Sequence, residues 1–132
     1  MLKIHTDGAF DIKTNQATIG YIIETFPKST LVKQHAEKIF AKDNHEAEFI
    51  ALNYALDYLI KTQQTNQILS IETDSKILCD SIDKRYAKNY QELTQDILNQ
   101  LDRFYDHYIK LIPDKQNFRA HKLANDRLFE LK

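Results

Sequence analysis

The sequence predicts an α/β fold in which a five-stranded mixed sheet is flanked by helices. Segments rich in β-forming residues follow one another closely over the first 40 residues, separated by short polar turns. From residue 43 onward, helical periodicities alternate with two short apolar segments. Three strands joined by hairpins, followed by two strands reached through helical crossovers, give a mixed sheet with helices packed on it.

The first three strands are expected at residues 2–9, 17–26 and 30–40. The polar segment from Asp11 to Gln16 and the triplet Pro27-Lys28-Ser29 predict the turns between them. Because such short connections join antiparallel neighbours, these three strands predict an antiparallel meander.

A long helix is predicted next, from apolar residues that recur at three- and four-residue steps: Phe49, Leu52, Leu56, Leu59 and Ile60. Asp43, with Glu46 three positions later, predicts a capping box at the start of this helix. Residues 67–73 predict a buried fourth strand that ends at Asp74.

The remaining elements are expected to be helices over residues 75–84 and near 90–106, a fifth strand over residues 107–112 and a closing helix over residues 118–131. Pro113 stops the fifth strand, because proline cannot donate to the ladder. The predicted order is therefore βββ–α–β–α–α–β–α.

The bulk composition narrows the classes of function. A length of 132 residues and a hydrophobic content of 42% suit one domain, residues 1–132, with a real core. The net charge of −1 gives no global field that draws nucleic acid, so such a contact needs a local basic patch. Cys79 is the only cysteine, which excludes an intramolecular disulfide and fits a reducing compartment.

Residues 1–30 contain no basic segment followed by an apolar run, and no stretch approaches the roughly 20 apolar residues that span a bilayer. We therefore expect a cytoplasmic protein without membrane association.

Three carboxylates stand in segments that are expected to meet in the fold. Asp7 lies in the first strand, Asp74 at the end of the fourth, and Glu48 in the first turns of the long helix. If the first and fourth strands are neighbours, about 4.8 Å apart, Asp7 and Asp74 can point at one ion. Oxygen ligands favour Mg²⁺ or Mn²⁺, and two such ions about 3.5–4 Å apart can promote phosphodiester cleavage.

Each of these acids also has a plain structural interpretation. Most of the 19 acidic residues must be surface charges. Asp7 suits a turn before Gly8, Asp74 suits a helix N-cap, and Glu48 suits the positive end of a helix dipole. Spacing alone leaves both interpretations open.

Four segments together resemble ribonuclease H type 1, the enzymes that cut the RNA strand of an RNA–DNA hybrid. These segments are Thr6-Asp7-Gly8-Ala9, Asn44-His45-Glu46-Ala47-Glu48-Phe49, Thr73-Asp74-Ser75, and Asn117 to Asn125. The resemblance covers nearly the whole chain and is to the compact prokaryotic form without the basic handle. It implies a ribonuclease H-like fold, whose order of elements is the one predicted above.

The resemblance implies a metal-dependent endoribonuclease that hydrolyses the RNA strand of RNA–DNA hybrids by a two-metal mechanism. It implies that Asp7, Glu48 and Asp74 are the catalytic ligands of Mg²⁺ or Mn²⁺. Substrate contacts are expected at Asn44, Gly8, Ser75 and Arg119. We expect a monomer that recognises the shape and 2′-OH groups of the hybrid and not its base sequence.

The main departure from the family pattern is His121, which stands where the closing motif usually carries Asp. As a fourth catalytic ligand, neutral imidazole suits Mn²⁺ better than Mg²⁺, so we predict weaker metal binding and a preference for Mn²⁺. Asp126 is a poor substitute, because five residues along a helix turn it about 140° away. His121 also fits a proton shuttle or a plain helix-surface histidine, and these interpretations stay open.

Smaller departures concern the first turn and two other histidines. Residues 10–19 contain no glycine, whereas the family often has a glycine-rich segment there. His45 stands where many relatives have Asn, and His5 shares the strand face of Asp7.

A second class of function remains open, namely a ribonuclease H-like nucleic-acid-binding module with little or no catalysis. A nuclease on structured DNA or double-stranded RNA would use the same chemistry. Basic residues that can meet backbone phosphates gather at Lys84, Arg85, Lys88, Lys110, Lys115, Arg119 and Lys122. Because the net charge is near zero, we predict weak affinity for hybrids.

Overall fold

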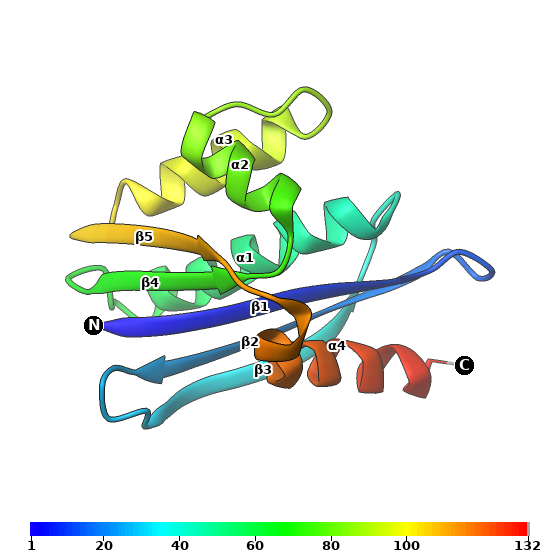
Figure 1. The fold of residues 1–132 in the computed structure, drawn as a ribbon, viewed down its shortest axis with the longest axis horizontal. Helices are drawn as coiled ribbons and strands as arrows, with labels where there is room; N and C mark the ends of the chain where they lie inside the picture. Colours follow the sequence, from blue (N-terminus) through cyan, green and yellow to red (C-terminus); the bar gives the residue numbers. More distant parts are fainter. Residues whose placement is uncertain (132) are drawn as a thin grey trace.

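The computed structural model describes residues 1–131, which form one five-stranded sheet with helices on both faces (Figure 1). The strands are β1 (Leu2–Asp11), β2 (Gln16–Thr25), β3 (Leu31–Ile39), β4 (Ile68–Thr73) and β5 (Asp106–Leu111). The helices are α1 (Asn44–Lys61), α2 (Lys76–Lys84), α3 (Gln91–Leu101), the short 3₁₀ helix η1 (Asp114–Asn117) and α4 (Phe118–Glu130).

The sheet has the strand order β3-β2-β1-β4-β5, which places β1 at its centre. The first three strands pair antiparallel, whereas β4 pairs parallel with both β1 and β5. The expected fold class, with three antiparallel strands and two reached by helical crossovers, is confirmed. Because β1 and β4 are neighbours, the residues that follow the end of β4 lie beside the middle of β1.

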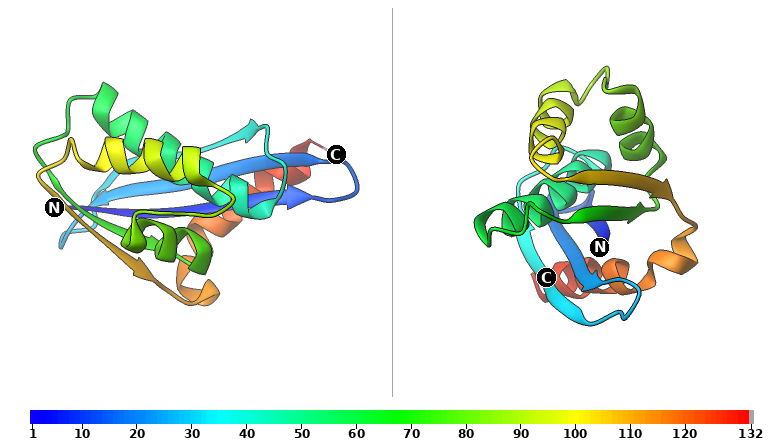
Figure 2. Two further views of the ribbon diagram at one scale, coloured as in Figure 1. Left: turned by 90° about the horizontal axis from the view of Figure 1, so that it is seen from above. Right: turned by 90° about the vertical axis from the view of Figure 1, so that its left-hand side faces the viewer.

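The helices divide between the two faces of the sheet (Figure 2). Helix α1 packs on β1 and β2, with α2 and α3 beside it on the same side. Helix α4 packs on the opposite face, against all three antiparallel strands. The main core lies under α1, where strand and helix side chains are fully buried: Ile4, Ile19, Ile23, Phe49, Leu52, Leu56, Leu59, Leu69 and Ile71.

Local sequence signals explain how several elements begin and turn. Helix α1 starts where expected, because Asp43 Oδ1 accepts a hydrogen bond from the backbone N–H of Glu46 at 2.8 Å. The β1–β2 turn needs one residue with positive φ, and Asn15 supplies it at φ 58°. The turn therefore forms without a glycine in residues 10–19, although the family often has a glycine-rich segment there.

Several element boundaries shift by one or two residues, and three differences matter for the fold. Helix α3 ends at Leu101 and not near residue 106, because residues 102–104 tighten into turns and fold Phe104 back onto the core. The third strand stops at Ile39, which leaves Phe40 89% exposed. The 3₁₀ turn η1 before α4 was not expected, since four polar residues after a proline carry no apolar periodicity.

Within residues 1–131, every helix is too short or too polar to traverse a lipid bilayer.

Candidate metal centre

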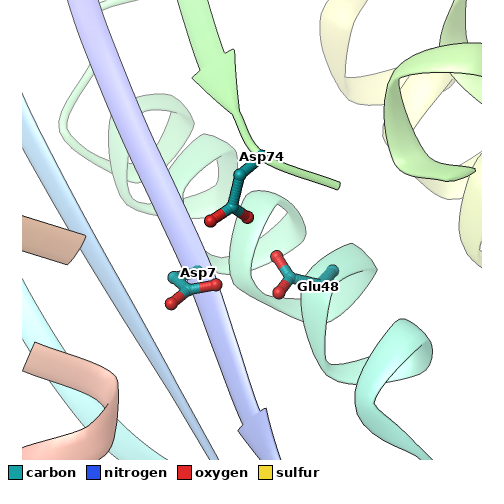
Figure 3. A group of neighbouring side chains, drawn as sticks. All are labelled: Asp7, Glu48 and Asp74. Atoms are coloured by element: carbon teal, nitrogen blue, oxygen red, sulfur yellow. The ribbon is translucent and has the colours of Figure 1, made fainter. Parts of the chain in front are cut away.

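Three acidic side chains from different elements meet at the centre of the molecule. Asp7 comes from β1, Glu48 from the second turn of α1, and Asp74 from the residue directly after β4. One carboxylate oxygen from each lies within 4.8 Å of the other two. The three carboxylates are turned toward one another (Figure 3). The structure thus brings together the three acids singled out in the sequence.

Gly8 is the residue that lets α1 approach β1 this closely. A Cβ atom at Gly8 would lie 2.6 Å from the backbone carbon of Ala47 and 2.8 Å from the backbone nitrogen of Glu48. Real Cβ atoms do not come so near backbone atoms, so any other residue would push the helix away. The backbone N–H of Gly8 also favours the charged form of the Glu48 carboxylate. Gly8 therefore positions Glu48 beside Asp7.

Asp74 is free to face the site because its neighbour caps the following helix. Ser75 Oγ accepts a hydrogen bond from the backbone N–H of Leu78 at 3.2 Å, which makes Ser75 the N-cap of α2. The structural interpretation of Asp74 as an N-cap is therefore wrong. The interpretation of Asp7 as a turn residue is also wrong, because Asp7 lies inside the ten-residue strand β1.

The acids disfavour one another's ionisation. Burial raises the pKa of Glu48 well above its usual range, and the charge of Asp7 and a hydrogen bond with it add to this. Burial, followed by the charges of Asp7 and Asp114, raises the pKa of Asp74 to about 6. Because these pKa values are raised, the three carboxylates can all be ionised near neutral pH only when a cation lies among them.

The donor set fits a hard divalent cation. Glu48 is 4% exposed, yet its Oε2 has no hydrogen-bond partner among residues 1–131. A buried carboxylate oxygen without a partner is costly unless it binds a cation. All three ligand atoms are oxygens, which suits Mg²⁺ or Mn²⁺ better than zinc.

His121 reaches the same cluster from the opposite face of the sheet. Its Nδ1 lies 2.8 Å from Asp7 Oδ2, and its side chain is 60% exposed. Gly20, which pairs with Asp7 across β1 and β2, makes this contact accessible. A Cβ atom there would lie 2.8 Å from the backbone nitrogen of Ala124 in α4. The predicted fourth position therefore lies beside Asp7, with an imidazole in place of a carboxylate.

The cluster forms the floor of a cleft with a volume of about 420 Å³. Three of the four predicted substrate-contacting residues line this cleft, namely Asn44, Gly8 and Ser75. Asn44 is exposed at the first turn of α1, with His45 next to it. A nucleic-acid backbone lying in this cleft would pass directly over the acids.

Arg119, the fourth predicted substrate contact, is not among the residues that line the cleft. Its guanidinium lies 3.1 Å from Glu24 Oε2, in an ion pair on the first turn of α4. Lys122 is likewise paired, with Asp126 at 2.8 Å, so Asp126 serves a surface ion pair. His5 shares the strand face of Asp7 but contacts Glu72 at 3.0 Å.

Two residues beside the acids were given no role from the sequence: Asp114 was not singled out, and Asn117 appeared only as the first residue of the fourth family segment. Asp114, at the start of η1, lines the cleft, and its charge contributes to the raised pKa of Asp74. Asn117 is fully buried, and its Nδ2 donates a hydrogen bond to the carbonyl of Thr6, directly before Asp7, at 2.8 Å. The sequence signal for Asp114 was weak, since an acid directly after a proline is typical of an ordinary turn.

Comparisons with known proteins agree with this geometry. A family model described as reverse transcriptase-like matches residues 5–127. A protein of Enterococcus faecalis with the name "Putative hydrolase EbsB" is 32% identical over 130 residues, covering 97% of this chain and 94% of that protein.

Solved structures of ribonuclease H1 share the fold. The protein from the halophilic archaeon Halobacterium salinarum matches with a TM-score of 0.88 at 22% identity, covering 98% of both chains. LC11-RNase H1, solved in complex with an RNA/DNA hybrid, matches with a TM-score of 0.87 at 23% identity, covering 99% of both chains. The ribonuclease H-like fold expected from the sequence is thereby confirmed.

Proposed function

Because the chain belongs to the reverse transcriptase-like family and has the ribonuclease H fold, we propose that it is a metal-dependent nuclease that hydrolyses the RNA strand of RNA–DNA hybrids. The observation that carries this proposal is the carboxylate trio Asp7, Glu48 and Asp74, of which Asp7 and Glu48 are buried and Asp74 is half-buried, on the floor of an open cleft. A structural neighbour solved with an RNA/DNA hybrid supports the choice of substrate.

In this proposal Asp7, Glu48 and Asp74 hold Mg²⁺ or Mn²⁺. Divalent cations held there supply the positive charge that activates a water for attack on phosphorus and stabilises the leaving oxygen. The protein contributes the fixed positions of the carboxylates, since Gly8 holds α1 against β1 and Ser75 leaves Asp74 free.

The exposed residues at the rim of the cleft suit contacts with the RNA strand. Asn44 and His45 are exposed in the first turn of α1, where backbone N–H groups have no acceptor within the helix. Both side chains can donate hydrogen bonds to a 2′-OH or a phosphate oxygen. His121, exposed beside Asp7, can exchange a proton between the leaving oxygen and solvent.

The test is cleavage of an RNA–DNA hybrid with Mg²⁺ or Mn²⁺ by the wild type and by Asp74→Asn. We expect metal-dependent cleavage that falls at least about 100-fold in Asp74→Asn, because the variant loses one negative ligand. Asp96→Asn, an exposed acid on α3, is the matched control and should cleave normally. Cleavage that persists in Asp74→Asn would point to a contaminating nuclease or another site.

One observation favours a second candidate, a hybrid-binding module with little catalysis. The contact between His121 and Asp7 occupies an oxygen that faces the site. Under this alternative, hybrid binding is measurable while cleavage is absent with either metal. A panel that includes double-stranded RNA and structured DNA separates both candidates from a nuclease of different specificity.

A further inference from the structure

The 3₁₀ turn η1 is tied at both ends to the strands that carry the acids. Before the turn, the backbone N–H of Ile112 donates to the carbonyl of Thr73 at 2.8 Å, directly before Asp74. At its end, Asn117 Nδ2 donates to the carbonyl of Thr6 at 2.8 Å, directly before Asp7. Ile112 and Asn117 are both buried, so the turn has a fixed place over the site.

Asp114 is the first residue of this turn and faces the acids. It lines the cleft together with Asp7, Glu48 and Asp74, and it lies near enough to Asp74 to raise the pKa of that carboxyl group. A cation that binds Asp74 on this side is therefore within reach of Asp114, directly or through one water. Asp114 is itself exposed, so its position does not follow from packing needs.

Without Asp114, the carboxylates of the site carry too little negative charge to balance two divalent cations. Asp7, Glu48 and Asp74 contribute three negative charges when ionised, whereas His121 contributes none. Two divalent cations carry four positive charges, and a fourth carboxylate would balance them. The partnerless, buried Oε2 of Glu48 independently indicates that a cation belongs in this cluster.

We propose that Asp114 is the fourth carboxylate of the metal centre and binds the second divalent cation together with Asp74, in place of the carboxylate missing at position 121. This inference rests on the proposed function, because it assigns one more ligand to the same centre. It predicts that two cations can bind without a carboxylate at position 121, because Asp114 in η1 supplies the charge.

The test counts bound Mn²⁺ by electron paramagnetic resonance and isothermal titration calorimetry, without substrate. Wild type is expected to bind two ions, and Asp114→Asn and Asp114→Ser are expected to bind the second at least about tenfold more weakly. The matched control Asp96→Asn should keep wild-type affinities. Thermal unfolding without metal checks that the variants fold, and removing a repulsive charge beside Asp74 should not lower their midpoint.

A rescue variant sharpens the test. If Asp114 supplies the missing charge, His121→Asp introduced into Asp114→Asn should restore tight binding of the second ion. Unchanged Mn²⁺ binding in both Asp114 variants would overturn this inference, while cleavage that depends on Asp74 would leave the proposed function standing. A wild type that binds no second ion also overturns it, and absence of both Mn²⁺ binding and cleavage overturns both proposals.

Discussion

At the scale of single residues, the site differs from a cluster of four carboxylates because His121 occupies the fourth position. Its Nδ1 contacts Asp7 Oδ2 at 2.8 Å and adds no negative charge. A neutral nitrogen ligand is weaker for Mg²⁺ than a carboxylate and is better tolerated by Mn²⁺. We therefore expect the metal preference of the protein to respond to a change of this side chain.

Changing His121→Asp should move the metal preference toward Mg²⁺. The added carboxylate faces the same oxygen of Asp7, so the variant needs a cation between them in order to stay ionised. We expect the ratio of Mg²⁺- to Mn²⁺-dependent cleavage rates to rise about tenfold. An unchanged ratio across a full metal titration would mean that His121 is only a surface residue of α4. Asn99→Asp, at an exposed position of α3, is the control.

The pKa of Asp74, raised to about 6, predicts how stability depends on pH in the absence of metal. A carboxyl group with a raised pKa binds its proton more tightly in the folded than in the unfolded state. Stability is therefore lost as pH rises from the ordinary value of 3.8 to about 6, and stays lower above that.

In EDTA, Asp74→Asn should unfold at a higher temperature than wild type at about pH 7, and the difference should vanish near about pH 4. The substitution removes a charge that is unfavourable only when ionised. Added Mn²⁺ should reverse the order at about pH 7, because only wild type has the full ligand set. Scanning calorimetry at several pH values measures both effects. A difference in unfolding temperature that does not change with pH would contradict the raised pKa of Asp74.

At the scale of elements, the distance between α1 and β1 is set by Gly8. A Cβ atom there meets backbone atoms of Ala47 and Glu48, which cannot rotate away. Gly8→Ala should therefore displace the start of α1, lower stability by about 1–3 kcal/mol and weaken Mn²⁺ binding.

Gly20→Ala is the informative comparison, because its Cβ atom meets α4 on the opposite face. It should lower stability by a similar amount while leaving Glu48 in place, so its effect on Mn²⁺ affinity should be smaller. Denaturant unfolding measures the stability of each variant, and titration calorimetry measures its affinity for Mn²⁺. Equal losses of metal affinity in both variants would show that Gly8 has no special role at the site.

Elements with strong local signals were predictable from the sequence. The order of strands and helices followed from β-forming segments and apolar periodicity, and the start of α1 followed from Asp43. The cluster of Asp7, Glu48 and Asp74 required the pairing of β1 with β4, which depends on contacts distant in sequence. Asp114 was missed because its place depends on two tertiary hydrogen bonds, from Ile112 and from Asn117.

At the scale of the whole molecule, charge is distributed so that little attraction for nucleic acid remains. The net charge is −1, and several basic side chains already have acidic partners: Arg85 with Asp102, Arg119 with Glu24, and Lys122 with Asp126. The cleft itself is lined by four acids, which repel phosphates until cations bind. Hybrid binding should therefore be weak and should depend on the metal.

We expect the dissociation constant for an RNA–DNA hybrid to exceed about 1 μM at 150 mM salt, and to weaken further with salt along a shallow slope. Each phosphate contact contributes about 0.9 to that slope. Lys76, a basic residue that lines the cleft, is already paired with Asp80 at 2.7 Å. Fluorescence anisotropy with Asp74→Asn keeps the hybrid intact during the titration. Lys84→Ala combined with Lys88→Ala should flatten the slope if the α2–α3 connection contacts phosphates. Nanomolar affinity at this salt concentration would mean that a basic surface outside these residues binds the substrate.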